Sequence, residues 1–153
     1  MKPMLTIETS TPVEHVALVE DGSVVAESRD TVGRGHTETL LATVDSVLSR
    51  AGVGVKQLHA IVVSIGPGRF SGLRVGLATA KGLSASSGVP VVPVETLPAL
   101  ALSGASRRGL VCPMLDARRG EVYGALFRRG EGLERLLSDA ALSPAALLER
   151  VRG

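Results

Sequence analysis

The chain has 153 residues, of which 44% are hydrophobic and 21% charged, and its formal net charge is only +2. This composition fits one ordinary domain or two small lobes and excludes a disordered chain. Aromatic residues make up 2% of the sequence. This scarcity argues against an autonomous binder of single-stranded nucleic acid, because such proteins stack bases on aromatic rings.

The cysteine count and the hydropathy pattern indicate in which cellular compartment the protein is expected. Cys112 is the only cysteine, so neither an internal disulfide nor a cysteine zinc cage is expected. It lies in an apolar run, which favours a buried strand residue over a nucleophile. No run of 18 apolar residues predicts a membrane span, and the first residues lack the apolar core of a signal peptide. We therefore expect a cytoplasmic protein with no membrane contact.

The first two thirds of the chain alternate between strand and helix patterns. Asp21-Gly22 between two β-rich runs is a strong hairpin signal. Thr37 or Thr39 could cap the first helix, and Gly52 and Gly88 mark helix ends. In chain order, the expected elements are strands at 5–7, 13–20 and 23–28, a helix from 36 or 37 to about 50, a strand at 60–65, a helix from about 71 to 86, an edge strand at 89–94 and a short helix at 95–103.

The polar segment 103–109 is the expected boundary between two parts, 1–104 and 105–153. Strand patterns return after it, and Ser143 followed by Pro144 predicts the start of a final helix. Both parts open with strands joined by hairpin turns, so two related lobes are expected. The sequence thus predicts an α/β chain with a mixed sheet, flanking helices and a partial second lobe.

The glycine-rich segment 66–82 connects a buried strand to a helix and forms that helix. Its glycines allow two interpretations, an anion-binding turn or close helix packing. Such turns build anion sites in α/β proteins. Its small residues at helical spacing instead form a groove that a second helix can approach, or they pack on the chain's own sheet; the residues alone favour these two packings equally. The partner-binding set predicted from this helix and the preceding one is Leu40, Leu41, Val44, Gly72, Leu73, Gly76, Leu77 and Ala80.

Metal chemistry has little support in the sequence. His36 and Glu38 begin the first helix, but a second histidine one helical turn away is missing, so no metal site is predicted. Asp116 could reach a nucleotide or metal, or equally could stabilise a turn with Arg118 or Arg119 as ion partner. No Walker lysine follows the glycines.

Four segments, 5–11, 35–41, 66–82 and 115–123, together resemble the TsaB (YeaZ) family, and the resemblance covers residues 4 to about 128. It implies an actin/hsp70-like fold of two ribonuclease-H-like lobes. It also implies a non-catalytic role in forming N6-threonylcarbamoyladenosine at position 37 of tRNA. In that family a metal-bearing paralogue, TsaD, transfers the threonylcarbamoyl group, and an ATPase, TsaE, joins the two. Members generally continue beyond the point where this chain ends, so the second lobe is expected to be incomplete.

The resemblance further implies that the helices at 37–50 and 70–86 pair with their counterparts on TsaD in a four-helix bundle. Without TsaD, a homodimer through the same surface is the expected substitute. Contact with tRNA is expected to be indirect or weak, because arginine pairs in turns are usually solvated.

The alternative function is an actin-fold nucleotide-binding hydrolase or phosphotransferase. In the actin-like kinases a glycine in the first turn lets the backbone approach a phosphate, whereas this chain has Ser10 there. No tightly bound cofactor is therefore expected, and a nucleotide at the subunit interface remains an open alternative. The residues that would line a reduced nucleotide cleft are Thr9, Ser10, Thr11, Gly66, Gly68, Ser71 and Asp116.

Overall fold

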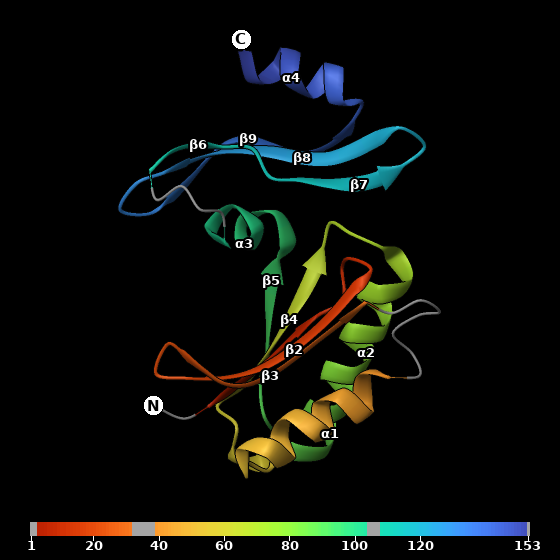
Figure 1. Cartoon of the computed structure of the whole chain (residues 1–153), viewed down its shortest axis with the longest axis vertical. Helices are drawn as coiled ribbons and strands as arrows, with labels where there is room; N and C mark the ends of the chain where they lie inside the picture. Colours follow the sequence, from red (N-terminus) through yellow and green to blue (C-terminus); the bar gives the residue numbers. More distant parts are fainter. Residues whose placement is uncertain (1–2, 32–38, 104–107, 153) are drawn as a thin grey trace. The chain divides into compact units, whose positions relative to one another are not determined.

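The computed structural model describes residues 3–31, 39–103 and 108–152 (Figure 1). The chain divides into two compact units, the first made of residues 1–65 and 69–94 and the second of residues 66–68 and 95–153. Each unit has its own sheet and its own core, and each is described below by itself.

The first unit is a five-stranded mixed sheet with two helices. Its elements are β1 (Met4–Glu8), β2 (Val13–Glu20), β3 (Ser23–Thr31), α1 (Leu40–Ala51), the short 3-10 helix η1 (Val55–Gln57), β4 (Ala60–Gly66), α2 (Phe70–Ser87) and β5 (Val91–Glu95). The strand order is β3-β2-β1-β4-β5, with β1 antiparallel to β2 and parallel to β4. The predicted hairpin between β2 and β3 is confirmed, and β5 lies at the sheet edge, as the two prolines of segment 89–94 predicted.

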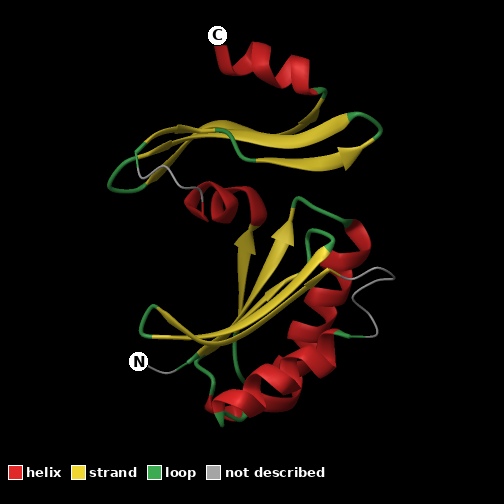
Figure 2. Cartoon of the chain, viewed as in Figure 1, coloured by secondary structure: helices red, strands yellow, loops and turns green. Residues whose placement is uncertain are grey.

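One face of this sheet and both helices share the core, and Figure 2 shows α1 and α2 on the same side of the strands. Alternate strand residues point to this face because successive side chains in a strand alternate between its two sides. The buried apolar residues include Leu5, Ile7, Val16, Leu18, Ile61 and Val63 from the strands and Leu40, Val44 and Val47 from α1.

The helix ends largely follow the predicted signals. Gly52 and Gly88 adopt left-handed backbone conformations, with φ of 66° and 78°, and end α1 and α2 as expected. Thr39 holds the N-cap position of α1, but its hydroxyl makes no capping bond to the helix backbone. Thr37 lies outside the described residues.

The second unit is an antiparallel sheet with two helices. Its elements are α3 (Thr96–Ser103), β6 (Gly109–Val111), β7 (Met114–Arg118), β8 (Glu121–Arg129), β9 (Leu133–Leu142) and α4 (Pro144–Arg152). Strand β8 is central and pairs with β6, β7 and β9. Ser143 caps α4 as predicted, because its hydroxyl accepts the Ala146 N–H at 3.3 Å. The order β7-β8-β9-α4 repeats the order β1-β2-β3-α1 that opens the first unit.

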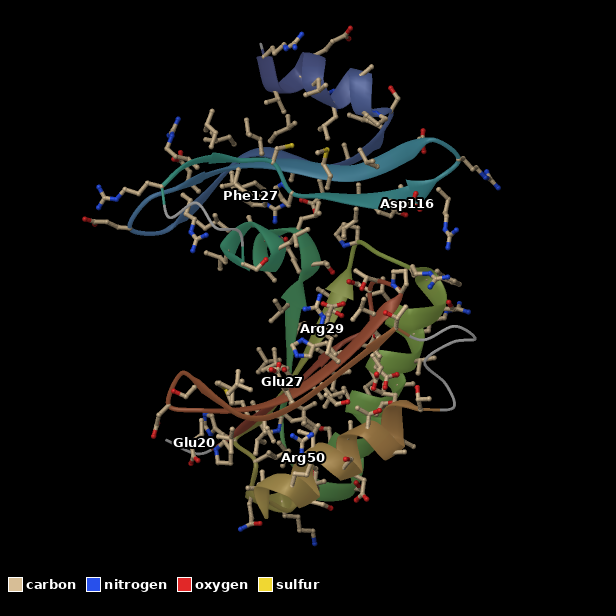
Figure 3. All side chains as sticks on the ribbon, viewed as in Figure 1. Glu20, Glu27, Arg29, Arg50, Asp116 and Phe127 are labelled. Atoms are coloured by element: carbon tan, nitrogen blue, oxygen red, sulfur yellow. The ribbon has the colours of Figure 1, made fainter. Side chains whose placement is uncertain are left out.

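The two units divide between Val94 and Glu95, earlier than the boundary predicted after residue 104. The reason is that α3 packs in the second core, where Leu97 and Ala101 are fully buried beside Phe127. Phe127 is labelled on β8 in Figure 3. The boundary was predicted in the polar segment 103–109, of which residues 104–107 lie outside the described residues.

Candidate functional site

The first turn, which follows β1, is locked to α2 by Thr9. The Thr9 side chain is fully buried, and its hydroxyl donates to the Gly72 carbonyl at 2.8 Å. A Cβ atom built on Gly76 would overlap Thr9 Oγ1. Thr9 therefore fills the space that glycine leaves on α2, and its hydroxyl is committed to the chain itself.

Glu8 and Ser10 close the same turn. The Ser10 N–H donates to Glu8 Oε1 at 2.5 Å, and the Ser64 hydroxyl donates to the same oxygen at 3.2 Å. The Arg69 N–H, at the start of α2, donates to the Ser10 carbonyl at 2.7 Å. One Glu8 oxygen therefore organises the backbone of the turn, which is the structural role that hydrogen-bonding side chains commonly have in turns.

One polar atom of this turn stays unsatisfied. Ser10 Oγ is buried and has no hydrogen-bond partner among the residues that the structure describes. A buried hydroxyl without a partner is uncommon and calls for an explanation. It is the feature of the first turn that most resembles a ligand-facing group.

The predicted nucleotide-cleft set is not brought together within one unit. Thr9 and Ser10 are in the first unit, together with Thr11, whose hydroxyl accepts the Val13 N–H at 3.2 Å. Ser71 is exposed on α2. The remaining members, Gly66, Gly68 and Asp116, belong to the second unit.

Asp116 has a turn role rather than an ionic one. Its Oδ1 accepts the backbone N–H of Arg118 at 2.8 Å. Within the described ranges neither Arg118 nor Arg119 forms an ion pair with it, so the ion-pair alternative is wrong.

The small-residue stripe that was predicted to bind a partner faces inward. Gly72, Gly76 and Ala80 are the buried residues of α2, and Gly76 packs on Thr9 and Ile7 of the first turn and β1. The chain's own sheet thus occupies this groove, which corrects the prediction. Glycine is needed at position 76 because the approach is too close for a Cβ atom.

The other predicted partner-binding residues divide by burial. Leu40 and Val44 are core residues with 1% and 2% exposure, so they too are corrected. Leu73 and Leu77 are half-buried, and Leu77 packs against the core. Leu41 is 63% exposed and stays a candidate contact.

A different stripe of α2 faces outward. We call it the outer face of α2 and define it as the exposed residues Phe70, Arg74, Ala78, Lys81, Gly82 and Ala85. Small residues again form its centre, and a Cβ atom on Gly82 would meet nothing within 4 Å. The helix therefore has small residues on two opposite sides, and only the side with Gly72, Gly76 and Ala80 is buried.

Phe70 and Arg74 form a stacked pair at one end of this outer face. The Arg74 guanidinium carbon lies 3.9 Å from the centre of the Phe70 ring. Phe70 is nevertheless 68% exposed. A cation–π pair of this kind places an aromatic residue and an arginine, two residue types that are enriched at protein interfaces, on an accessible surface.

Sequence reasoning missed Glu14, a buried carboxylate beneath α1. Glu14 is 2% exposed, and its two oxygens accept hydroxyl hydrogen bonds from Thr39 at 2.9 Å and Thr43 at 2.7 Å. These bonds tie β2 to the first turn of α1. The signal was present in the sequence, because Glu14 alternates with Val16 and Leu18 on the apolar side of β2.

The described residues offer neither a cluster of metal ligands nor a membrane-spanning helix. Over residues 3–31, 39–103 and 108–152, no group of three or more His, Cys, Asp or Glu side chains could hold a metal ion. His36 and Glu38 lie outside these ranges. No helix in the described part of the chain is long and apolar enough to cross a membrane.

The mixed sheet with its flanking helices defines an α/β protein. A family model described as "TsaD: tRNA N6-adenosine threonylcarbamoyltransferase" matches residues 24–151. The chain is 34% identical to the tRNA threonylcarbamoyladenosine biosynthesis protein TsaB of Bacillus subtilis over 150 residues. It is also 34% identical to TsaB of Escherichia coli over 156 residues.

Each of these alignments covers 97% of this chain and 66% of the relative. The structure of YeaZ from Pseudomonas aeruginosa matches with a TM-score of 0.85 and 31% identity, over 94% of this chain and 68% of that one. The chain therefore belongs to the TsaB (YeaZ) family. It spans 66% of the length of the two TsaB relatives.

Proposed function

We propose that the chain acts as a non-catalytic subunit in the formation of N6-threonylcarbamoyladenosine in tRNA, and that it binds and activates the TsaD catalytic subunit. The observation that carries this proposal is the outer face of α2. Small residues there allow close helix approach, and an exposed Phe70–Arg74 stack flanks them. The names of the TsaB relatives support the pathway.

The first turn supports a non-catalytic role. Thr9 donates inward to Gly72, and one oxygen of Glu8 accepts from Ser10 and Ser64. Side chains that already form hydrogen bonds within the chain are poorly placed to bind a phosphate or a metal. The turn stabilises the lobe and thereby positions α2.

The partner surface comprises Leu41 of α1 together with the outer face of α2. The match to the TsaD family model supports a partner with the same fold, which would present an equivalent pair of helices. Two such pairs can form a four-helix bundle through nearly self-complementary surfaces. By the same reasoning, we expect a homodimer when the catalytic subunit is absent, and the ATPase TsaE joins the heterodimer. We place this complex in the cytoplasm.

A second candidate function, nucleotide binding, is favoured by one observation. Ser10 Oγ is buried and unsatisfied, and Ser10 lies at the N-terminus of α2, because its carbonyl accepts the N–H of the N-cap residue Arg69. Helix N-termini attract phosphates. This candidate predicts that the isolated chain binds a nucleoside triphosphate.

The partner role is tested by measuring the affinity of the chain for TsaD. Ala78→Arg places a long charged side chain in the centre of the outer face of α2, and we expect it to weaken binding at least about 100-fold, in the range of hot-spot disruption. Ala99→Arg, at an exposed alanine of α3, is the matched control and should bind within about twofold. Circular dichroism confirms that both variants fold. Equal affinity of Ala78→Arg and the unchanged chain would refute the proposed surface.

A further inference from the structure

The turn between β7 and β8 has an unusual backbone for its residues. Arg118, Arg119 and Gly120 all adopt left-handed conformations, with φ of 69°, 54° and 78°. Arg118 pairs with Glu121, so Arg119 and Gly120 are the two central residues of a tight hairpin. Both central positions of such a turn require positive φ, which favours asparagine, aspartate or glycine.

A second hairpin turn of the same chain has the residue types that are preferred at these central positions. In the hairpin between β2 and β3, Glu20 pairs with Ser23, and the central residues are Asp21 and Gly22 with φ of 50° and 76°. The β7–β8 turn has arginine where that turn has aspartate. It also places a second arginine, Arg118, in the left-handed region directly before it. Arginine gains nothing from this backbone conformation, so the choice of residue needs another reason.

Contacts within the chain do not supply that reason. Asp116 accepts the Arg118 backbone N–H and so holds the turn, but it leaves the guanidinium free. Both arginine side chains are exposed, and in the described part of the chain neither has a hydrogen-bond or ion-pair partner. Two other arginines of the same sheet differ, because Arg128 of β8 pairs with Glu134 and Arg135 of β9 pairs with Glu95 and Asp139.

We infer that Arg118 and Arg119 contact the phosphodiester backbone of an RNA, contrary to the expectation that arginine pairs in turns are solvated, because their left-handed backbone sets this pair apart. Two neighbouring guanidinium groups on a tight hairpin offer forked donors that match phosphate oxygens. The short turn fixes their backbone before binding, so less conformational freedom is lost on contact. Identifying the RNA as tRNA rests on the proposed function. The contact is electrostatic and independent of sequence, since phosphate contacts position a nucleic acid without reading its bases.

The inference is tested with a double variant, Arg118→Asn and Arg119→Asn, in the full chain. Asparagine tolerates the left-handed conformation, so the turn should persist while two charges are lost. The matched control, Arg150→Gln and Arg152→Gln, removes two charges from exposed positions of α4. Binding of an unmodified tRNA transcript is followed by fluorescence anisotropy from about 50 to about 300 mM salt.

We expect the turn variant to bind tRNA about tenfold more weakly or worse at about 100 mM salt, and the slope of log K against log salt to become shallower by about 2. The control variant should keep its affinity within about twofold. Equal weakening in both variants would mean that net charge alone is responsible and would overturn the inference. Failure of the unchanged chain to bind the transcript would overturn it as well.

Affinity for the TsaD subunit, measured on the same preparations, separates this inference from the proposed function. The turn variant should bind that subunit as the unchanged chain does. If it loses the subunit and keeps tRNA, the turn contacts an acidic protein surface and the inference is wrong. If the unchanged chain fails to bind the subunit while its tRNA affinity depends on the turn, the proposed function fails and the RNA contact stands.

Discussion

The Thr9 side chain occupies the space that Gly76 leaves on α2 because it has no side chain. The Thr9 hydroxyl donates to the Gly72 carbonyl one helical turn before Gly76, and a Cβ atom at position 76 would overlap that hydroxyl. This contact fixes which side of α2 faces the sheet. It therefore also fixes which side, with Ala78 and Gly82, is open to a partner.

Gly76→Ala should lower the free energy of unfolding by about 1–3 kcal/mol, because the added methyl group overpacks the contact with Thr9. The loss should exceed the helix-propensity gain of up to about 1 kcal/mol from replacing glycine by alanine. Urea denaturation measures both terms together.

The same contact predicts compensation between the two sites. In a Thr9→Ala background the nearest remaining Thr9 atom, Cβ, is 3.6 Å from the new methyl group, which is ordinary contact. Gly76→Ala should then cost at least about 1 kcal/mol less than in the unchanged chain. Strict additivity of the two substitutions would contradict this packing.

Glu14→Gln should destabilise the first unit by about 1–3 kcal/mol, because Thr39 and Thr43 donate to different Glu14 oxygens and the substitution turns one of them into an NH2 group that accepts no hydrogen bond. Glu20→Gln, at an exposed position at the end of the same strand, is the control and should change stability by no more than about 0.5 kcal/mol. Equal stability of the two variants would show that the carboxylate does not hold α1.

Cys112 should react slowly with iodoacetamide in the folded chain. Burial raises the pKa of its thiol, so less of the reactive thiolate is present at a given pH. The rate should rise with pH, and its midpoint should lie above that of the urea-unfolded chain. Mass spectrometry follows the modification, and coincident midpoints would contradict the burial of the thiol.

In a calorimetric titration the isolated chain should show no MgATP binding at concentrations up to about 5 mM. Any dissociation constant would then lie above the millimolar range. The physical reason is that Thr9 and Glu8 already form hydrogen bonds within the chain, and that Ser10 has a side chain where a phosphate turn needs close backbone approach. A saturable heat of binding would favour the nucleotide-binding alternative.

Local signals predicted most of the elements. The Asp21-Gly22 hairpin, the glycine ends of both long helices and the Ser143 cap each depend on a few adjacent residues, and the structure confirms them. The resemblance of four motifs to the TsaB family is confirmed by comparison with known proteins.

The orientation of α2 could not be predicted, because it depends on a contact distant in sequence. Gly72, Gly76 and Ala80 lie on one side of the helix and Ala78, Gly82 and Ala85 on the other, so helical spacing alone does not choose between them. Thr9 decides the choice, sixty-three positions away from Gly72. The predicted boundary between the two units was wrong for a similar reason, because it depends on the packing of α3 against Phe127, which is a tertiary contact.

The non-catalytic partner role is tested most directly by the amount of N6-threonylcarbamoyladenosine formed in tRNA by TsaD and TsaE with and without this chain. We expect product only when the chain is present, its loss with Ala78→Arg, and its retention with the control Ala99→Arg. Equal product without the chain, or full product with folded Ala78→Arg, would contradict the proposed role.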